Sequence, residues 1–222
     1  MFFLVVAIAV VGMIANARVN SVYKKYAKVR AKIGLPAHDV AQRLLYAGGS
    51  DAQLTEVGGR LTDHYDPRSN VVGLSQAVYN DASVAALAVA AHEIGHVMQY
   101  QEAYGPIKLR NALLPVAKIG SAAAPWIVIA GVLMGSFGLA SFGAWLFAGI
   151  LLFQLVTLPV EFNASRRALD MLTAGGYIDT YDEEAAARKV LNAAATTYVV
   201  AALASFVSFL RLLMIANSAR RR

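Results

Sequence analysis

Apolar residues are concentrated in four long stretches, and polar and basic segments separate most of them. The stretches cover residues 2–17, 119–134, 139–160 and 193–215. A membrane helix needs about 17–25 apolar residues, so the first is short and the third is a full-length span. The second can extend back to Leu113 if the Lys118 side chain reaches the membrane interface. The pattern therefore predicts a mostly α protein with a bundle of about four membrane helices, and residues 135–138 form a tight hairpin.

The more polar segment before residue 113 has the periodicities of a small mixed domain. Residues 36–47 predict a short helix that begins at Pro36 and ends at a Gly-Gly pair. Two short β-like runs follow at 53–57 and 71–75. The polar, turn-rich residues 61–68 between them predict a loop.

A long helix is expected from Asp81 to Tyr104, because apolar residues recur at the spacing of a buried helix face. Asp81 or Ser83 can cap its start. Gly105 and Pro106 are expected to end it, since proline cannot continue a helix.

Composition restricts the class of protein. The chain has 222 residues, of which 58% are hydrophobic, and no cysteine. It is too apolar for an ordinary soluble domain, and any metal site must use histidine and carboxylate ligands. The net charge is +6, but much of the excess lies beside the apolar stretches. Membrane topology explains these basic residues, so nucleic-acid binding is not expected, whereas binding of anionic lipid by residues 18–32 is plausible.

The charge distribution also predicts an orientation. Basic residues follow the first apolar stretch and none precedes it, which favours an uncleaved anchor over a signal peptide cleaved near Ala17. The positive-inside rule then places residues 18–112 and 161–190 in the cytoplasm of a multi-pass protein of the cell membrane. The last stretch conflicts with this scheme, because a span there would put the basic residues 220–222 outside. A re-entrant or interfacial helix is the alternative.

The strongest chemical signal is the pentad at residues 92–96, with the sequence His-Glu-Ile-Gly-His. On a helix, His92 and His96 project from one face and can bind one Zn²⁺ together. Glu93 can reach the attacking water and act as its general base. The alternative is a pair of histidines on a buried helix, satisfied by backbone groups or water.

A catalytic zinc site takes three protein ligands. Glu161 is the favoured third ligand, because a carboxylate at the end of a membrane span needs a partner. Ser165, four residues on, would share its helix face and could orient a ligand. Glu161 could instead solvate the helix end or pair with Arg166 or Arg167. His64 is the alternative ligand.

The pentad and residues 161–166, Glu-Phe-Asn-Ala-Ser-Arg, together resemble the YugP-type membrane zinc metallopeptidases, which are related to the HtpX-type gluzincins. Further matching segments are 25–30, 61–68, 108–110 and 155–169. The resemblance implies a zincin-like domain at the membrane face, with Glu161 as the downstream glutamate ligand. HtpX-type enzymes usually have aspartate four positions later, where this chain has Ser165. Residues 63–74 resemble their substrate-binding edge strand, which aligns a peptide by strand addition.

The sequence thus predicts a zinc-dependent endopeptidase that cleaves membrane proteins or peptides near the cytoplasmic face of the bilayer. His64, Tyr65 and Arg166 are candidate donors to the oxyanion of the transition state. The main alternative is a non-catalytic scaffold with structural zinc that is a partner in a membrane-protein complex, and a transporter is a weaker one. The expected domains are the anchor (1–17), the zincin-like domain (18–112), the membrane hairpin (113–160), the third-ligand segment (161–190) and the C-terminal membrane segment (191–222).

Overall fold

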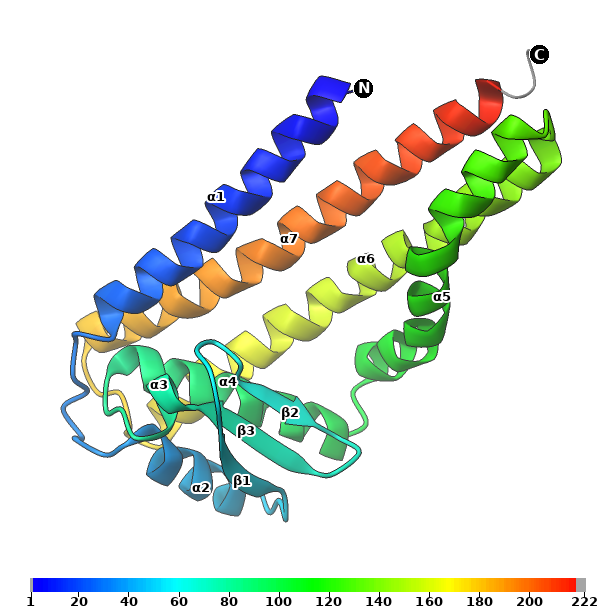
Figure 1. Cartoon of the computed structure of the whole chain (residues 1–222). Coiled ribbons are helices and arrows are strands. Elements are labelled where there is room, and N and C mark those ends of the chain that lie inside the picture. The colour runs from blue at the N-terminus through cyan, green and yellow to red at the C-terminus, as the bar shows by residue number, and fades with distance from the viewer. Residues whose placement is uncertain (1, 219–222) are drawn as a thin grey trace. The chain divides into compact units, whose positions relative to one another are not determined.

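Four long helices account for most of the chain, and a small three-stranded sheet lies between the first and second of them in sequence (Figure 1). The computed structural model describes residues 2–218. Within them α1 (Phe2–Tyr26), α5 (Gly105–Leu133), α6 (Phe137–Ala174) and α7 (Tyr181–Ser218) are each long and apolar enough to cross a membrane. The prediction of a mostly α protein with about four membrane helices is therefore confirmed. α1 continues nine residues beyond the predicted anchor, which makes it long enough to span.

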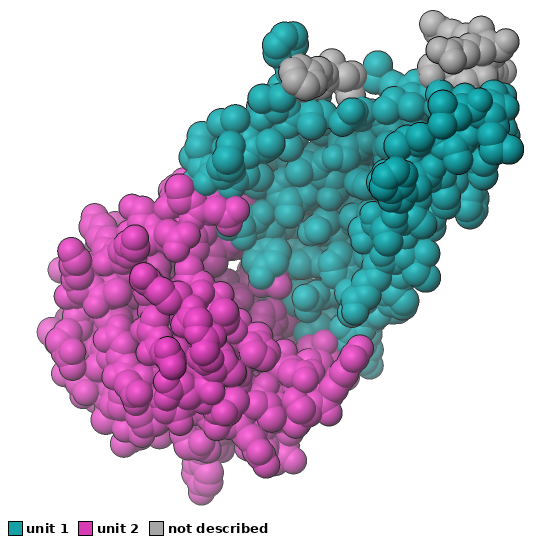
Figure 2. Space-filling model, viewed as in Figure 1, with its two compact units in different colours: residues 1–15, 105–160, 197–222 teal, residues 16–104, 161–196 magenta. Residues whose placement is uncertain are grey.

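The described residues divide into two compact units (Figure 2). The first draws on residues 1–15, 105–160 and 197–222, and the second on residues 16–104 and 161–196. α1, α6 and α7 each have one end in the first unit and the other end in the second. The candidate site described in residues 64–65, 92–102 and 161–167 lies wholly within the second unit.

In the first unit, α5 and α6 form an antiparallel hairpin with close backbone approach. The turn uses Gly135, whose φ of 64° suits glycine. A Cβ on Gly131 would lie 2.3 Å from the Ala140 backbone nitrogen, and one on Gly143 would lie 2.9 Å from the Val128 nitrogen. Gly131 and Gly143 thus let the two helix backbones pack closely.

The second unit combines α2 (Ala37–Ala47), β1 (Gln53–Val57), β2 (His64–Asp66), β3 (Val71–Ser75), α3 (Gln76–Tyr79) and α4 (Val84–Gln101) with residues 16–26 of α1, 161–174 of α6 and 181–196 of α7. The strand order is β1-β3-β2, with β1 parallel and β2 antiparallel to β3. The three strands include β2 where a loop was expected. Three residues carry too little periodicity to predict a strand, and pairing with β3 defines this one.

α4 is the central helix of this unit, and 13 of its 18 residues are buried. Ser83 caps its start, since the Ser83 side chain accepts a hydrogen bond from the Ala86 amide. The helix ends at Gln101, three residues before the predicted Tyr104. Gly105 and Pro106 begin α5, because proline fits the first turn of a helix, where its missing N–H is not needed.

α6 and α7 carry the chain from one unit to the other without a break. α6 continues through Pro159, so Glu161 lies on the same helix as the apolar span before it. α7 begins with a capping box, in which Thr180 and Glu183 bond each other's backbone amides. It includes the last apolar stretch as continuous helix, and residues 220–222 lie outside the described residues.

Candidate metal centre

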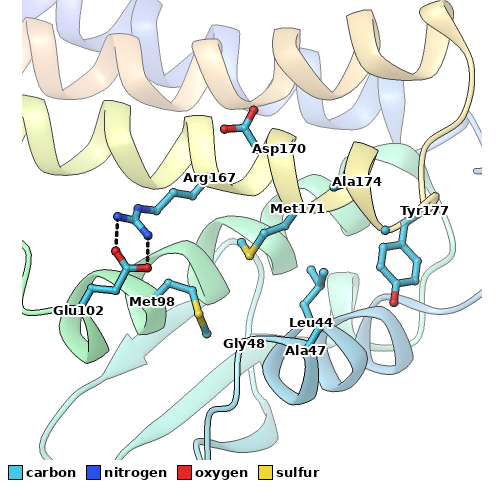
Figure 3. A pocket seen from close by; sticks show the side chains of 11 residues that line it. Leu44, Ala47, Gly48, Met98, Glu102, Arg167, Asp170, Met171, Ala174 and Tyr177 are labelled. Atoms are coloured by element: carbon cyan, nitrogen blue, oxygen red, sulfur yellow. Dashed lines mark hydrogen bonds and ion pairs between the residues drawn. The ribbon is translucent and has the colours of Figure 1, made fainter.

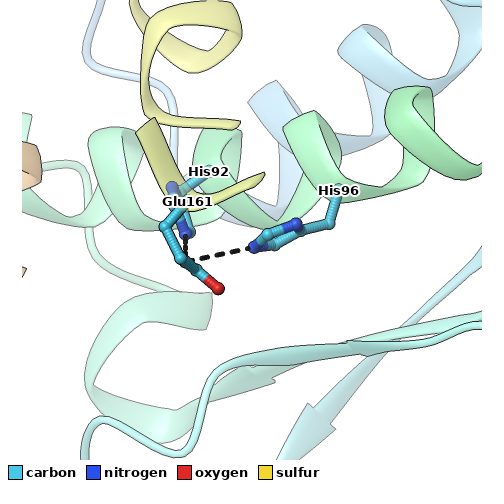
Figure 4. Close-up of side chains that lie close together, drawn as sticks. All are labelled: His92, His96 and Glu161. Atoms are coloured by element: carbon cyan, nitrogen blue, oxygen red, sulfur yellow. Dashed lines mark ion pairs between the residues drawn. The ribbon is translucent and has the colours of Figure 1, made fainter. Parts of the chain in front are cut away.

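His92 and His96 lie on the same face of α4, one turn apart, as their spacing requires. Their ring centroids are 4.8 Å apart and the rings are nearly perpendicular, at 83°. Both side chains are largely buried but keep some access to solvent. The Nε2 atoms of both rings point toward α6 (Figure 4).

Glu161 of α6 completes this group. Its Oε2 atom lies 3.3 Å from His92 Nε2 and 3.6 Å from His96 Nε2 (Figure 4). The carboxylate is only 3% exposed, and Oε2 has no hydrogen-bond partner in the described structure. Two zinc ligands at tetrahedral positions, each about 2.0–2.1 Å from the ion, lie about 3.3–3.4 Å apart. A buried, unpartnered carboxylate oxygen facing two imidazole nitrogens at about this separation fits a zinc ion well.

Gly95 allows α4 and α6 to come this close. A Cβ at this position would lie 2.7 Å from the Ala164 carbonyl oxygen and 3.2 Å from that residue's Cα. The backbone of α6 therefore rests on the Gly95 Cα, one turn after Glu161. Glycine at the fourth position of the pentad has a packing function that the motif by itself does not reveal.

Glu93 is buried at 8% exposure, next to the first histidine on α4. Burial raises the pKa of its carboxyl group, and the neighbouring His92 and His96 oppose that rise. A carboxylate with a raised pKa is suited to take up and release a proton near neutral pH.

Ser165 lies beside the other nitrogen of His92, with its Oγ 3.3 Å from Nδ1. This is a long hydrogen bond. The structure thus brings together five of the predicted residues, which are His92, Glu93, His96, Glu161 and Ser165. Glu161 pairs with neither Arg166 nor Arg167 among the ion pairs of the described residues; Arg167 pairs with Glu102.

The remaining three candidates lie outside the cluster of metal-ligating atoms in the described residues. His64 is an exposed residue at the start of β2, and its Nδ1 lies 2.8 Å from the Thr62 carbonyl oxygen. Tyr65 is half-buried, its ring packs edge-on against Tyr100, and burial raises its pKa. Arg166 is exposed on α6.

Gln99 is a site residue that the sequence reasoning missed. It is fully buried, and its Oε1 lies 3.0 Å from His96 Nδ1, the nitrogen that faces away from Glu161. Its position three residues after His96 places it on the same helix face, which is the signal that could have revealed it.

Comparison with known proteins decides the family. A family model described as "Putative neutral zinc metallopeptidase" matches residues 1–217. The chain belongs to this family. It is also 44% identical over 218 residues to "Putative membrane protease YugP" of Bacillus subtilis (strain 168), covering 97% of this chain and 96% of that protein. No solved structure matches the chain. The protein is therefore a membrane zinc metallopeptidase, in agreement with the resemblance found in its sequence.

Proposed function

We propose that this metallopeptidase is an endopeptidase in which His92, His96 and Glu161 hold the zinc ion and Glu93 is the general base. The observation that carries the proposal is the buried Glu161 Oε2, which has no hydrogen-bond partner and faces the Nε2 atoms of both histidines. A carboxylate oxygen that accepts no hydrogen bond is costly to bury, so this arrangement favours a cation between the three side chains.

Zinc held by these three side chains would supply Lewis-acid chemistry, polarising the scissile carbonyl and acidifying water. The side chain of Glu93 accepts a proton from the attacking water and then delivers it to the leaving amine. Burial raises the pKa of Glu93, which favours its uptake of this proton. Burial of the site also limits competition from bulk water for the same groups.

The substrate is proposed to bind along β2, which ends the strand order β1-β3-β2. An edge strand has unpaired backbone groups that can align an extended peptide by strand addition. His64 and Tyr65 are on this strand, and α4 packs against it. We propose that His64, Tyr65 or Arg166 donates a hydrogen bond to the oxyanion once substrate is bound, since such hydrogen bonds often form only in the complex with substrate.

The assignment of Glu93 is tested by Glu93→Gln in the purified full-length protein. Zinc content should remain at the wild-type level, because all three ligands remain, while hydrolysis of a quenched peptide should fall by several powers of ten. Gln101→Met on the same helix is the matched control and should keep turnover. Full turnover in Glu93→Gln would overturn the proposed role of Glu93 as the general base.

The substrates are proposed to be membrane proteins or peptides near the cytoplasmic face. Basic residues in 18–32 follow the first span and support this orientation. Single cysteines can be introduced at Asp51, Asp179 and Gly138 of this cysteine-free chain. In intact cells an impermeant thiol reagent should label the cysteine at Gly138, and it should label the other two only after lysis. Labelling of Asp51→Cys and Asp179→Cys in intact cells would contradict the cytoplasmic placement.

A further inference from the structure

A continuous chain of hydrogen bonds runs from His96 to the surface of the second unit. His96 Nδ1 lies 3.0 Å from Gln99 Oε1, and Gln99 Nε2 donates to Asn163 Oδ1 at 2.9 Å. Arg167 Nε donates to the same Asn163 oxygen at 2.8 Å. The two terminal nitrogens of Arg167 donate to the two oxygens of Glu102 at 2.8 and 2.7 Å, at the edge of a pocket between α2, α4 and α6 (Figure 3).

The direction of donation along these hydrogen bonds is fixed, because arginine can only donate hydrogen bonds. The Asn163 atom that faces Arg167 must therefore be the carbonyl oxygen, although an amide can in general be turned either way. That oxygen also faces Gln99, so Gln99 must present its NH₂ group to Asn163. The Gln99 carbonyl oxygen is then left to face His96.

His96 must consequently carry a proton on Nδ1, since a carbonyl oxygen accepts hydrogen bonds only. In the neutral ring this leaves the lone pair on Nε2, the nitrogen 3.6 Å from Glu161 Oε2. A nitrogen binds zinc only through a free lone pair. The hydrogen-bond chain therefore leaves His96 Nε2 in the form that can bind zinc.

We propose that Arg167, through Asn163 and Gln99, fixes the tautomer and orientation of His96, and that these three are positioning residues for the metal centre. This inference rests on the proposed zinc site. Gln99 is suited to the role because it is fully buried, so no bulk water competes for its carbonyl oxygen. The bidentate pair with Glu102 holds the arginine end in place.

The direction of the chain is tested at Asn163, which acts only as an acceptor toward both neighbours. Aspartate keeps an acceptor oxygen, whereas leucine has a similar size and keeps none. Asn163→Asp should bind zinc within about threefold of the wild type, and Asn163→Leu should bind it about 10–100-fold more weakly, the usual cost of losing such a supporting bond. Competition with a chelating dye on the full-length protein in detergent measures both affinities.

Gln99→Met tests the next step with a side chain of similar length that has no acceptor oxygen. Zinc affinity should again fall about 10–100-fold. Gln101→Met is the control, since Gln101 donates to the Gly48 carbonyl oxygen and takes no part in the chain. If Gln99→Met does not fold, the pair of Asn163 variants decides the question.

A second readout does not depend on activity. In zinc-loaded protein labelled with ¹³C,¹⁵N-histidine, the Nδ1 proton of His96 should give a slowly exchanging signal, assigned through correlations from the His96 ring to its own backbone. The signal should persist in Asn163→Asp and shift or exchange faster in Asn163→Leu. Wild-type zinc affinity in Asn163→Leu, or equally weak binding in Asn163→Asp and Asn163→Leu, would overturn the inference. Neither result would affect the proposed function, which would fail if His96→Ala left zinc binding unchanged.

Discussion

Replacing Gly95 with alanine is the most informative perturbation of the geometry of the site. The new methyl carbon would lie 2.7 Å from the Ala164 carbonyl oxygen, whereas real Cβ atoms essentially never come closer than 3.0 Å. α4 and α6 must therefore separate by more than the roughly 0.2 Å within which zinc–ligand distances are held. Because Glu161 lies one turn before Ala164, its carboxylate would move away from the two histidines.

The effect on stability has two opposing parts. Alanine favours a helix over glycine by about 1 kcal/mol. Overpacking against the neighbouring backbone costs about 1–3 kcal/mol. The free energy of unfolding of the metal-free protein should thus fall only slightly, by about 0 to 2 kcal/mol. Zinc affinity should fall much more, by about tenfold or more, since the ligands no longer converge.

Zinc competition with a chelating dye and thermal unfolding in excess chelator would measure the two effects separately. Gly138→Ala is the matched control, because a Cβ at this glycine of α6 meets no atom within 4 Å. The control should keep wild-type zinc affinity. A Gly95→Ala protein that binds zinc like the wild type and melts at a higher temperature would refute the packing argument.

Three further predictions concern residues around the site. His64→Ala should keep zinc and lower peptide turnover, because its exposed ring lies outside the ligand cluster; metal analysis and a peptide assay check this. Ser165→Ala should lower zinc affinity by no more than about tenfold in a chelator competition, since its contact with His92 is long. Arg167 lowers the pKa of Glu102 below its ordinary 4.5, so the pair stabilises the fold above that pH and loses this effect as the pH falls through the lowered value. Glu102→Gln should therefore cost up to about 1 kcal/mol at pH 7 and nothing at low pH, as measured by thermal unfolding.

Each of these has a contrary outcome. Loss of zinc in His64→Ala would make that residue a ligand. A hundredfold or greater loss of zinc affinity in Ser165→Ala would show that the Ser165 bond to His92 is a major support of the metal site. A stability difference in Glu102→Gln that is the same at both pH values would show that packing, and not charge, accounts for the pair.

Sequence reasoning worked where the signal is local. The apolar stretches, the helix with its Ser83 cap and the strands at 53–57 and 71–75 all depend on periodicity or on neighbouring residues. The proximity of Glu161 to the two histidines was expected from chemistry, since a carboxylate at the end of a span needs a partner.

Features that depend on contacts between distant segments could not be found this way. β2 is a strand only through its pairing with β3. The bond between Gln99 and Asn163 joins residues 64 positions apart, and no periodicity encodes it. The packing of Gly95 on Ala164 likewise depends on where α6 lies. The sequence shows the glycine but not the backbone that it contacts.

Zinc stoichiometry under chelator competition, compared between the wild type, Glu161→Ala and His64→Ala, tests the central claim most directly. The wild type and His64→Ala should each retain one zinc ion per chain. Glu161→Ala should lose the metal at chelator concentrations at least tenfold lower, because a direct ligand is removed. Retention of zinc by Glu161→Ala together with its loss from His64→Ala would contradict the proposed metal centre.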